Sequence, residues 1–174
     1  RLLSGDVGFG KTEVAMNGIL ATLLSGNQAL FVCPTTLLAS QHYHGIFKRF
    51  ESFGFKISKL DGKTSAKEKA QIKKGLESGE MQLVIGTHSL LGVRAKNLAL
   101  VIIDEEHKFG VKQKEKLKHL REDIHIFSMS ATPIPRTLNL ALSKVKGMSS
   151  LLTPPRERLG VRSYVQETPS LQHL

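Results

Sequence analysis

With 174 residues, of which 40% are apolar and 23% charged, the chain has the length and composition of one globular domain, which excludes a disordered chain and a membrane-spanning helix bundle. Its 25 lysines and arginines outnumber the 15 acidic residues, and the formal net charge of +10 favours a polyanionic partner. The single cysteine, Cys33, excludes an internal disulfide framework and indicates a reducing compartment, so we expect a cytoplasmic protein without a membrane partner.

Short apolar runs alternate with longer amphipathic stretches along the chain, which is typical of an α/β protein. These runs predict strands at residues 2–3, 29–33, 55–60, 83–85, 98–103 and 124–129. The last three lack polar alternation, which indicates central strands of a mostly parallel sheet with helices on both faces.

Three stretches have the apolar periodicity of a helix. Apolar residues occupy most of the helical wheel over 10–24, so we expect a largely buried helix there. A second helix shows an apolar stripe over 39–50, and a third, rich in lysine, spans about 65–76. His42 and His44 lie two residues apart on the second helix and point to different faces, so they are not expected to bind a metal together.

A lysine-rich segment spans residues 108–121. As a strand it would have no apolar face, whereas as a helix it would bury a narrow stripe formed by Leu117, Leu120 and Ile124, so a helix is predicted. Its positive faces could lie along DNA or an acidic partner, or simply face solvent. The lysines between residues 63 and 74 leave the same alternatives open.

The two ends of the chain look cut. The first strand is clipped at Leu2, and a strand-like run at 161–165 ends before it could gain neighbours. Pro154-Pro155 resembles a linker. We therefore expect one lobe over residues 1–153, followed over 154–174 by a linker and the start of a truncated next lobe.

Eight consecutive residues match the phosphate-loop pattern, directly after a strand-like run and directly before a helix. Glycines let the backbone turn its N–H groups around phosphate oxygens, and the helix directs its positive N-terminus at the same place. We expect Lys11 to reach the β- and γ-phosphates of ATP, and the Thr12 hydroxyl to bind Mg²⁺. The expected nucleotide-binding residues are Gly5, Asp6, Val7, Gly8, Phe9, Gly10, Lys11 and Thr12.

An acidic run follows the apolar residues 100–103. Ligands of parallel sheets bind beyond the carboxyl ends of the strands, so these carboxylates should face the phosphate loop. Asp104 would hold Mg²⁺, and Glu105 would act as general base or position the attacking water. A solvated acidic turn is the alternative for this run taken alone.

Five motifs occur in the order of helicase motifs I, Ia, Ib, II and III: the phosphate loop, Pro34-Thr35-Thr36-Leu37-Leu38, Gly86-Thr87-His88, Asp104-Glu105-Glu106-His107 and Ser130-Ala131-Thr132-Pro133. This series resembles the first RecA-like motor lobe of superfamily 2 helicases, over nearly the whole chain. Ile134-Pro135-Arg136-Thr137 is similar to the RecG and Mfd branch. Phe9, Glu13, Glu106 and Thr153-Pro154-Pro155 are similar to the Mfd family of transcription-repair coupling factors. Lys108 departs from both, which usually carry arginine there.

The resemblance implies roles for further residues. Backbone and side chains of motifs Ia and Ib contact DNA phosphates in this superfamily, and motif III relays the nucleotide state to the DNA side. The implied nucleic-acid contacts are Thr35, Thr36, Thr87, His88 and Arg136, and the implied coupling residues are His107, Ser130 and Thr132. For Thr35 and Thr36 a helix N-cap is the alternative, and for Ser130 and Thr132 a turn that ends a strand.

The resemblance also implies a function: an ATP-dependent motor that moves on double-stranded DNA, removes stalled RNA polymerase and couples transcription to repair. RNA polymerase and nucleotide-excision repair proteins would contact other domains of the parent. Hydrolysis in this superfamily needs a second RecA-like lobe, so the isolated chain should be nearly inactive. The segment that reads adenine normally precedes motif I, so nucleotide binding should be weak and poorly base-selective.

Three rival functions stay open from the sequence. The nearest is a RecG-like branch-migration motor. A phosphate-loop kinase or switch-type module is more distant, since it would not need the Ser130-Ala131-Thr132 motif. The last is a non-catalytic basic DNA-binding module with a vestigial nucleotide loop.

Overall fold

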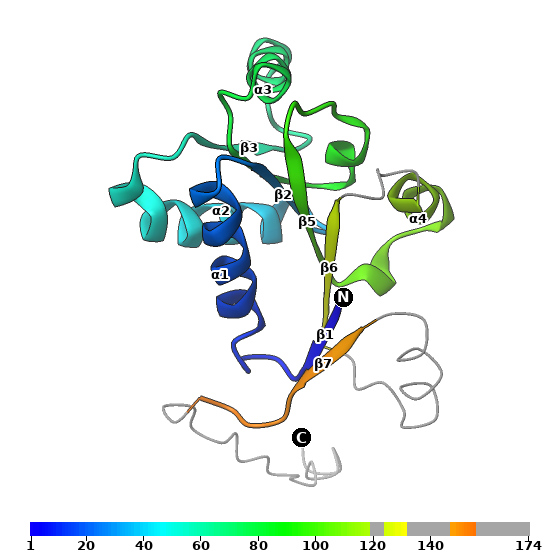
Figure 1. Ribbon diagram of the computed structural model, residues 1–174. Coiled ribbons are helices and arrows are strands. Elements are labelled where there is room, and N and C mark those ends of the chain that lie inside the picture. Colours follow the sequence, from blue (N-terminus) through cyan, green and yellow to red (C-terminus); the bar gives the residue numbers. More distant parts are fainter. Residues whose placement is uncertain (119–123, 132–146, 156–174) are drawn as a thin grey trace, which may run out of the picture.

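The computed structural model describes residues 1–118, 124–131 and 147–155, and the fold is a seven-stranded sheet with helices on both faces (Figure 1). The strands are β1 (Leu2–Gly5), β2 (Gln28–Val32), β3 (Ile57–Leu60), β4 (Leu83–Gly86), β5 (Leu98–Asp104), β6 (His125–Ser130) and β7 (Met148–Leu151). Their order is β3-β4-β2-β5-β6-β1-β7, and every pairing is parallel. The predicted parallel α/β fold is confirmed.

Four α-helices and three short 3₁₀ helices connect the strands in the described part of the chain. They are α1 (Lys11–Leu24), α2 (Thr36–Phe50), α3 (Ala66–Ser78), α4 (Val111–Lys118), η1 (Glu51–Phe53), η2 (His88–Gly92) and η3 (Glu106–Lys108). In Figure 1, α1 and α2 lie on one side of the sheet, and α3 and α4 on the other.

Alternate side chains of the central strands enter two different cores. In β2, Ala29 and Phe31 pack with α1 and α2, whereas Leu30 and Val32 pack with α3 and η2. The pleat sends neighbouring side chains to opposite faces, and both faces of this sheet are covered. This double burial explains why the central strands carry no polar alternation.

The lysine-rich helices were predicted correctly. Ser65 caps α3 through a reciprocal capping box with Glu68, which fixes its start despite a thin apolar stripe. α4 confirms the helix over the lysine-rich segment as far as Lys118; residues 119–123 lie outside the described part.

Two expectations need correction. α1 is not largely buried: Val14 is 38% exposed and Leu24 is 64% exposed, because the sheet covers one side of the helix only. β7 was not predicted, since its centre is Ser149-Ser150 and its sequence has no apolar run. Pairing with β1 makes it a strand. The boundary expected after residue 153 remains a prediction, because residues 156–174 lie outside the described part.

Gly86 lies where β3 and β4 approach closely, and we predict that Gly86→Ala destabilises the fold. A Cβ on Gly86 would lie 1.9 Å from the carbonyl oxygen of Leu60, too near for any side chain. The free energy of unfolding should fall by about 1–3 kcal/mol in a urea titration. Gly45→Ala is the control: its Cβ meets nothing within 4 Å and should stabilise α2 by about 0.5–1 kcal/mol. Equal stability of the two variants would contradict the close approach.

Candidate functional site

The predicted motifs lie in a row along one edge of the sheet. All strands are parallel, so their carboxyl ends meet at that edge. In strand order, β4 leads into Thr87, β2 into Thr35, β5 ends at Asp104, β6 at Ser130, and β1 leads into the phosphate loop. One strand lies between β5 and β1, so the ends of these two strands are about 10 Å apart. Lys11 and Asp104 therefore lie on the same side of the molecule.

The phosphate loop adopts the strained turn that its glycines permit. Gly8 has φ 78° and Gly10 has φ 86°, both in the left-handed region that disfavours a side chain. Gly10 is the N-cap of α1 and supplies no side chain to cap the helix. The amide groups of the first turn are thus directed at the position where an anion would lie.

Lys11 folds back into the loop. Its Nζ donates to the carbonyl oxygen of Gly5 at 2.5 Å and to that of Asp6 at 2.9 Å. These bonds hold the ammonium beside the loop, and a phosphate contact requires the side chain to exchange them. Lys11 thus lies in the phosphate loop, and its contact with phosphate stays a prediction.

Asp104 ends β5 as a largely buried carboxylate. Its Oδ2 lies 3.1 Å from Nε2 of His42, which comes from α2. The neighbouring thiol of Cys33 is fully buried, and burial, followed by the negative charge of Asp104, raises its pKa. A thiol so held is inert, and Cys33 belongs to the apolar core.

His42 is the site residue that the sequence did not reveal. Two turns of α2 separate it from Thr35, and its ring packs against Phe31 of β2 with the centroids 4.7 Å apart. The apolar stripe of α2 predicts which side of this helix is buried. The position of that side over Asp104 depends on how α2 crosses the sheet, which no local pattern encodes.

Glu105 follows Asp104 in a strained backbone conformation. Its φ of 52° is the single positive value of a non-glycine residue in the described part of the chain. The turn is held because the Glu105 N–H donates to the carbonyl oxygen of Met129 in β6 at 3.0 Å. Its carboxylate lies 3.2 Å from Nδ1 of His107. Strain of this kind is common at functional sites, where it orients a side chain that the chain would otherwise direct elsewhere.

The coupling residues are placed in part. Ser130 ends β6 and pairs with Ser4 of β1, so it lies between Asp104 and the phosphate loop. It is 7% exposed. His107 is exposed and contacts Glu105. Thr132 lies outside the described residues, so the relay through motif III stays a prediction.

The predicted DNA contacts gather at the other half of the same edge. Thr35 is exposed and caps α2, with its hydroxyl accepting from the N–H of Leu38 at 3.3 Å, while Thr36 is half-buried. Thr87 is 7% exposed and His88 is exposed, so within motif Ib the histidine offers more surface to a ligand. Arg136 lies outside the described residues.

Thr12 and Asp104 fit a magnesium ion that is shared with a nucleotide. Among the described residues, no group of three or more histidine, cysteine or acidic side chains could hold a metal ion. Mg²⁺ commonly takes one or two protein oxygens and completes its coordination with phosphates and water. Thr12 and His42 line one crevice of about 290 Å³ between α1 and α2, and His42 touches Asp104. Thr12 therefore lines the crevice that also contains His42, the residue in contact with Asp104.

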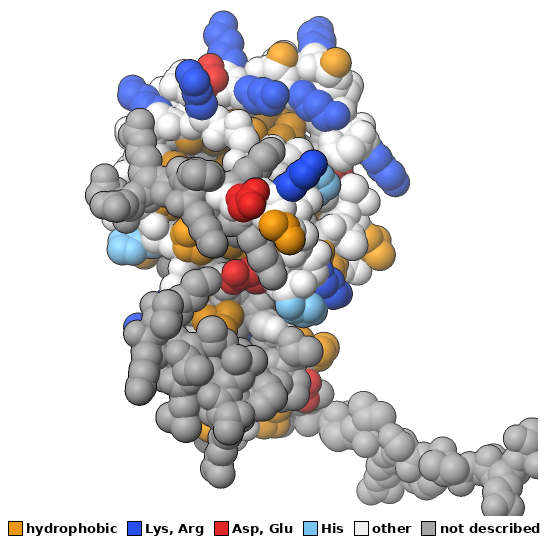
Figure 2. Space-filling view, turned by 90° about the vertical axis from the view of Figure 1, so that its right-hand side faces the viewer, with side chains coloured by type: hydrophobic (Ala, Val, Ile, Leu, Met, Phe, Trp, Pro, Cys, Tyr) orange, Lys and Arg blue, Asp and Glu red, His pale blue; other side chains and the backbone are white. Residues whose placement is uncertain are grey.

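A basic surface lies away from this edge. Figure 2 shows lysine and arginine side chains gathered at the end of the molecule that carries α3. Exposed lysines in and just before this helix are Lys63, Lys67, Lys73 and Lys74. Because these side chains face solvent, the structure is compatible with both alternatives: a contact with DNA or an acidic partner, or exposure to solvent alone.

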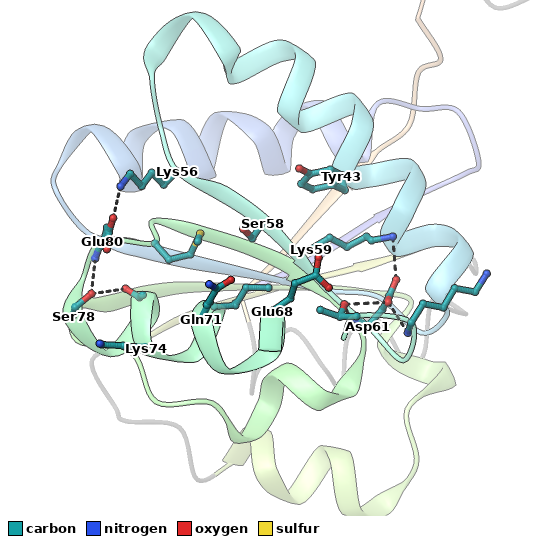
Figure 3. A pocket seen from close by; sticks show the side chains of 15 residues that line it. Tyr43, Lys56, Ser58, Lys59, Asp61, Glu68, Gln71, Lys74, Ser78 and Glu80 are labelled. Atoms are coloured by element: carbon teal, nitrogen blue, oxygen red, sulfur yellow. Dashed lines mark hydrogen bonds and ion pairs between the residues drawn. The ribbon is translucent and has the colours of Figure 1, made fainter. Parts of the chain in front are cut away.

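A groove of about 850 Å³ lies beside the edge strand β3 (Figure 3). Its lining mixes charges of both signs, including a Lys56–Glu80 pair and Lys59, whose Nζ lies 3.2 Å from Oδ2 of Asp61. Burial raises the pKa of the Asp61 carboxyl, but donors from Lys59, Lys63 and Thr64 outweigh burial and hold it below its ordinary value. β4, β2, β5 and β6 separate this groove from the phosphate-loop strand, so it is not the nucleotide site.

Two bacterial relatives match nearly the whole chain. The transcription-repair-coupling factor of Helicobacter pylori strain 26695 is 58% identical over 167 residues, which cover 96% of this chain and 16% of the relative. That of Escherichia coli K12 is 45% identical over 173 residues, which cover 98% of this chain and 15% of the relative. The chain thus spans about a sixth of the length of these relatives.

Solved helicase structures share the fold. A structure of RecG bound to a three-way DNA junction superposes with a TM-score of 0.79 at 41% identity, covering 92% of this chain and 22% of that one. The Hef helicase domain of Pyrococcus furiosus superposes with a TM-score of 0.65 at 20% identity, covering 86% of this chain and 34% of that one. At this identity the similarity supports the fold alone. The predicted resemblance to the RecG and Mfd branch is confirmed.

No helix in the described part of the chain is both long enough and apolar enough to cross a membrane. The protein-family model for DEAD/DEAH box helicases matches residues 2–141. This match contains the phosphate loop, the acidic strand end and the segments between them. Because it spans most of the sequence, the chain belongs to the DEAD/DEAH box helicase family.

Proposed function

We propose that this chain is the ATP-binding motor lobe of a double-stranded DNA translocase that removes stalled RNA polymerase and couples transcription to repair. The observation that carries the proposal is the row of motifs along one sheet edge, with the phosphate loop and Asp104 at one half and Thr35 and His88 at the other. The high identity to transcription-repair-coupling factors supports the specific task. RNA polymerase and repair proteins would bind through other domains of the full-length protein.

The nucleotide half would act on the triphosphate by position and charge. Amides of the loop and of the first turn of α1 would cradle the phosphates, with Lys11 on the terminal ones. Thr12 and Asp104 would hold Mg²⁺, which supplies neutralisation of the phosphate charge when bound. Glu105 would orient the attacking water and accept its proton.

The DNA half lies on the neighbouring strand ends, so nucleotide state and DNA contact share one framework. Thr35 begins α2, and the same helix carries His42 to Asp104. Small hydroxyl groups and helix N-termini suit contacts with phosphates that do not depend on sequence. A second lobe would close over this edge and complete the hydrolytic site.

A RecG-like branch-migration motor is the second candidate, favoured by the 41% identity to RecG. The two functions differ in substrate, and the full-length protein can be assayed on both. Release of RNA polymerase from stalled transcription complexes, with weak activity on branched DNA, is the expected result. Efficient regression of forked DNA without polymerase release would favour the RecG-like function instead.

Lys11→Ala is expected to weaken nucleotide binding by about 10–100-fold, because a charge-assisted hydrogen bond contributes about 1.5–3 kcal/mol. Titration of the full-length protein with a fluorescent ATP analogue measures this loss. Lys48→Ala, in an exposed side chain near the end of α2, is the control and should bind normally. Unchanged binding by Lys11→Ala would remove the phosphate loop from the proposal and leave a non-catalytic DNA-binding module.

A further inference from the structure

The contact between His42 and Asp104 joins two elements that the motif series treats as separate. His42 lies on α2, which begins at the proposed DNA contact Thr35, and Asp104 ends β5 at the proposed magnesium site. The two side chains are mostly buried, with 15% and 12% of their surface exposed, and Nε2 and Oδ2 are 3.1 Å apart. At this burial the hydrogen bond is shielded from competing water.

The imidazole is itself held in a fixed orientation. Its ring lies against Phe31 at a centroid distance of 4.7 Å, and Phe31 is fully buried in β2. Backbone and ring together therefore determine where Nε2 points. With its proton on Nε2, the ring donates to Oδ2 and restrains the rotation of the carboxylate, which would hold the magnesium ion.

Helix geometry connects this contact to the DNA side. Thr35 and His42 are seven residues apart, which is close to two turns, so both lie on the side of α2 that faces the sheet edge. Ala39 and Ile46 on the same side are fully or almost fully buried. A helix docked in this way moves as a unit, so a displacement of its N-terminus is transmitted to His42.

The phosphate-loop helix meets α2 at the same place. Thr12 and His42 line the crevice between α1 and α2, and Arg49 of α2 pairs with Glu13 of α1 at 2.9 Å. His42 thus touches Asp104 and lines the crevice between α1, the proposed nucleotide helix, and α2, the proposed DNA helix.

We propose that His42 is a positioning residue that orients the Asp104 carboxylate for magnesium and makes that orientation depend on DNA bound at the start of α2. This inference rests on the proposed function and assigns its coupling to a residue outside the five motifs. Partners that orient metal ligands typically change metal affinity or activity by about 10–100-fold when removed.

The test uses two variants of the full-length protein that differ in one group. His42→Leu keeps an apolar side chain against Phe31 but cannot donate a hydrogen bond. His42→Gln restores an N–H donor near the position of Nε2. His44→Leu is the matched control, because His44 lies two residues further on the same helix, is exposed, and contacts the carbonyl oxygen of Ser40 within α2.

Two binding measurements detect the effect of the His42 substitutions without ATP hydrolysis. The first is the dissociation constant of a fluorescent ADP analogue in Mg²⁺ and in EDTA. The second is the change in that constant when a blunt DNA duplex is added, which in coupled sites is typically about 5–150-fold. For His42→Leu we expect Mg²⁺ to strengthen nucleotide binding about 10–100-fold less than it does in the unsubstituted protein. We also expect the addition of DNA to leave the nucleotide dissociation constant of this variant nearly unchanged. DNA affinity without nucleotide should stay unchanged, and His42→Gln should recover both effects.

The outcomes separate this inference from the proposed function. If DNA leaves nucleotide affinity unchanged in the unsubstituted protein, the proposed motor function fails. If the unsubstituted protein shows the coupling and His42→Leu retains it, the role of His42 is wrong while the motor function stands. Loss in both His42→Leu and His42→Gln, with a lower midpoint of urea unfolding for both, would also overturn the inference, since it would indicate a purely structural role.

Discussion

ATP turnover by the isolated 174-residue chain is expected to be about 10³–10⁵ times slower than turnover by a full-length protein that carries it. Related phosphoryl-transfer enzymes lose this much when the arginine that neutralises the transition state is absent. In the crevice beside Thr12 the arginine among the described residues is Arg49, and its guanidinium is paired with Glu13. We expect the neutralising arginine to come from a second lobe, as the resemblance to superfamily 2 helicases implies. Steady-state phosphate release, with and without duplex DNA, measures the difference.

Folding of the isolated chain is checked in the same experiment. Two apolar cores cover both faces of the sheet, so circular dichroism should show a cooperative unfolding transition. A fluorescent ATP analogue should still bind weakly through the phosphate loop. Substantial DNA-stimulated turnover by this folded chain would contradict the requirement for a second lobe.

Glu105→Gln in the full-length protein is expected to lower ATP turnover by about 10²–10⁴-fold while nucleotide affinity stays unchanged. The amide keeps the shape of the side chain and can still hydrogen-bond to His107, but it cannot accept a proton from water. The strained turn at Glu105 is held through the backbone N–H bond to Met129, which the substitution leaves in place. Turnover and analogue binding, measured on the same preparation, separate chemistry from affinity.

The neighbouring residue provides the control for this substitution. Glu106 lies in the same acidic run and carries the same charge, so Glu106→Gln removes one negative charge without removing the assigned base. Its turnover should stay within a few-fold of the unsubstituted protein. If Glu105→Gln turns over as fast as Glu106→Gln, another group is the base.

Local sequence was sufficient for the phosphate loop and the strand ends. The glycines at positions 8 and 10 have the positive φ values that only such residues adopt easily, and Asp104 follows a buried apolar run directly. A parallel sheet places all carboxyl ends together, so the gathering of the motifs at one edge followed from the fold class. The proposed division of this edge into a nucleotide half and a DNA half depends on strand order, which the sequence did not supply.

Other features of the structure could not be predicted from the apolar periodicity of the sequence. β7 has serines at its centre and becomes a strand by pairing with β1. Thr87 is buried just beyond the end of β4, and Leu24 is exposed on the side of α1 that the sheet leaves uncovered. Each depends on a neighbour that is distant in the sequence.

The sequence by itself therefore determined the fold class and the family resemblance, and it predicted the residues that would bind a triphosphate, because these depend on short motifs whose chemistry acts within a few residues. Only the tertiary structure decided that His42 lies against Asp104, that Lys11 turns into its own loop, and that α2 runs from Thr35 to the Asp104 carboxylate. The physical reason is that these contacts depend on how α2 packs across the sheet and how seven strands are ordered. The packing of α2 and the strand order depend on contacts among many side chains that are distant in the sequence, so no local sequence pattern predicts them.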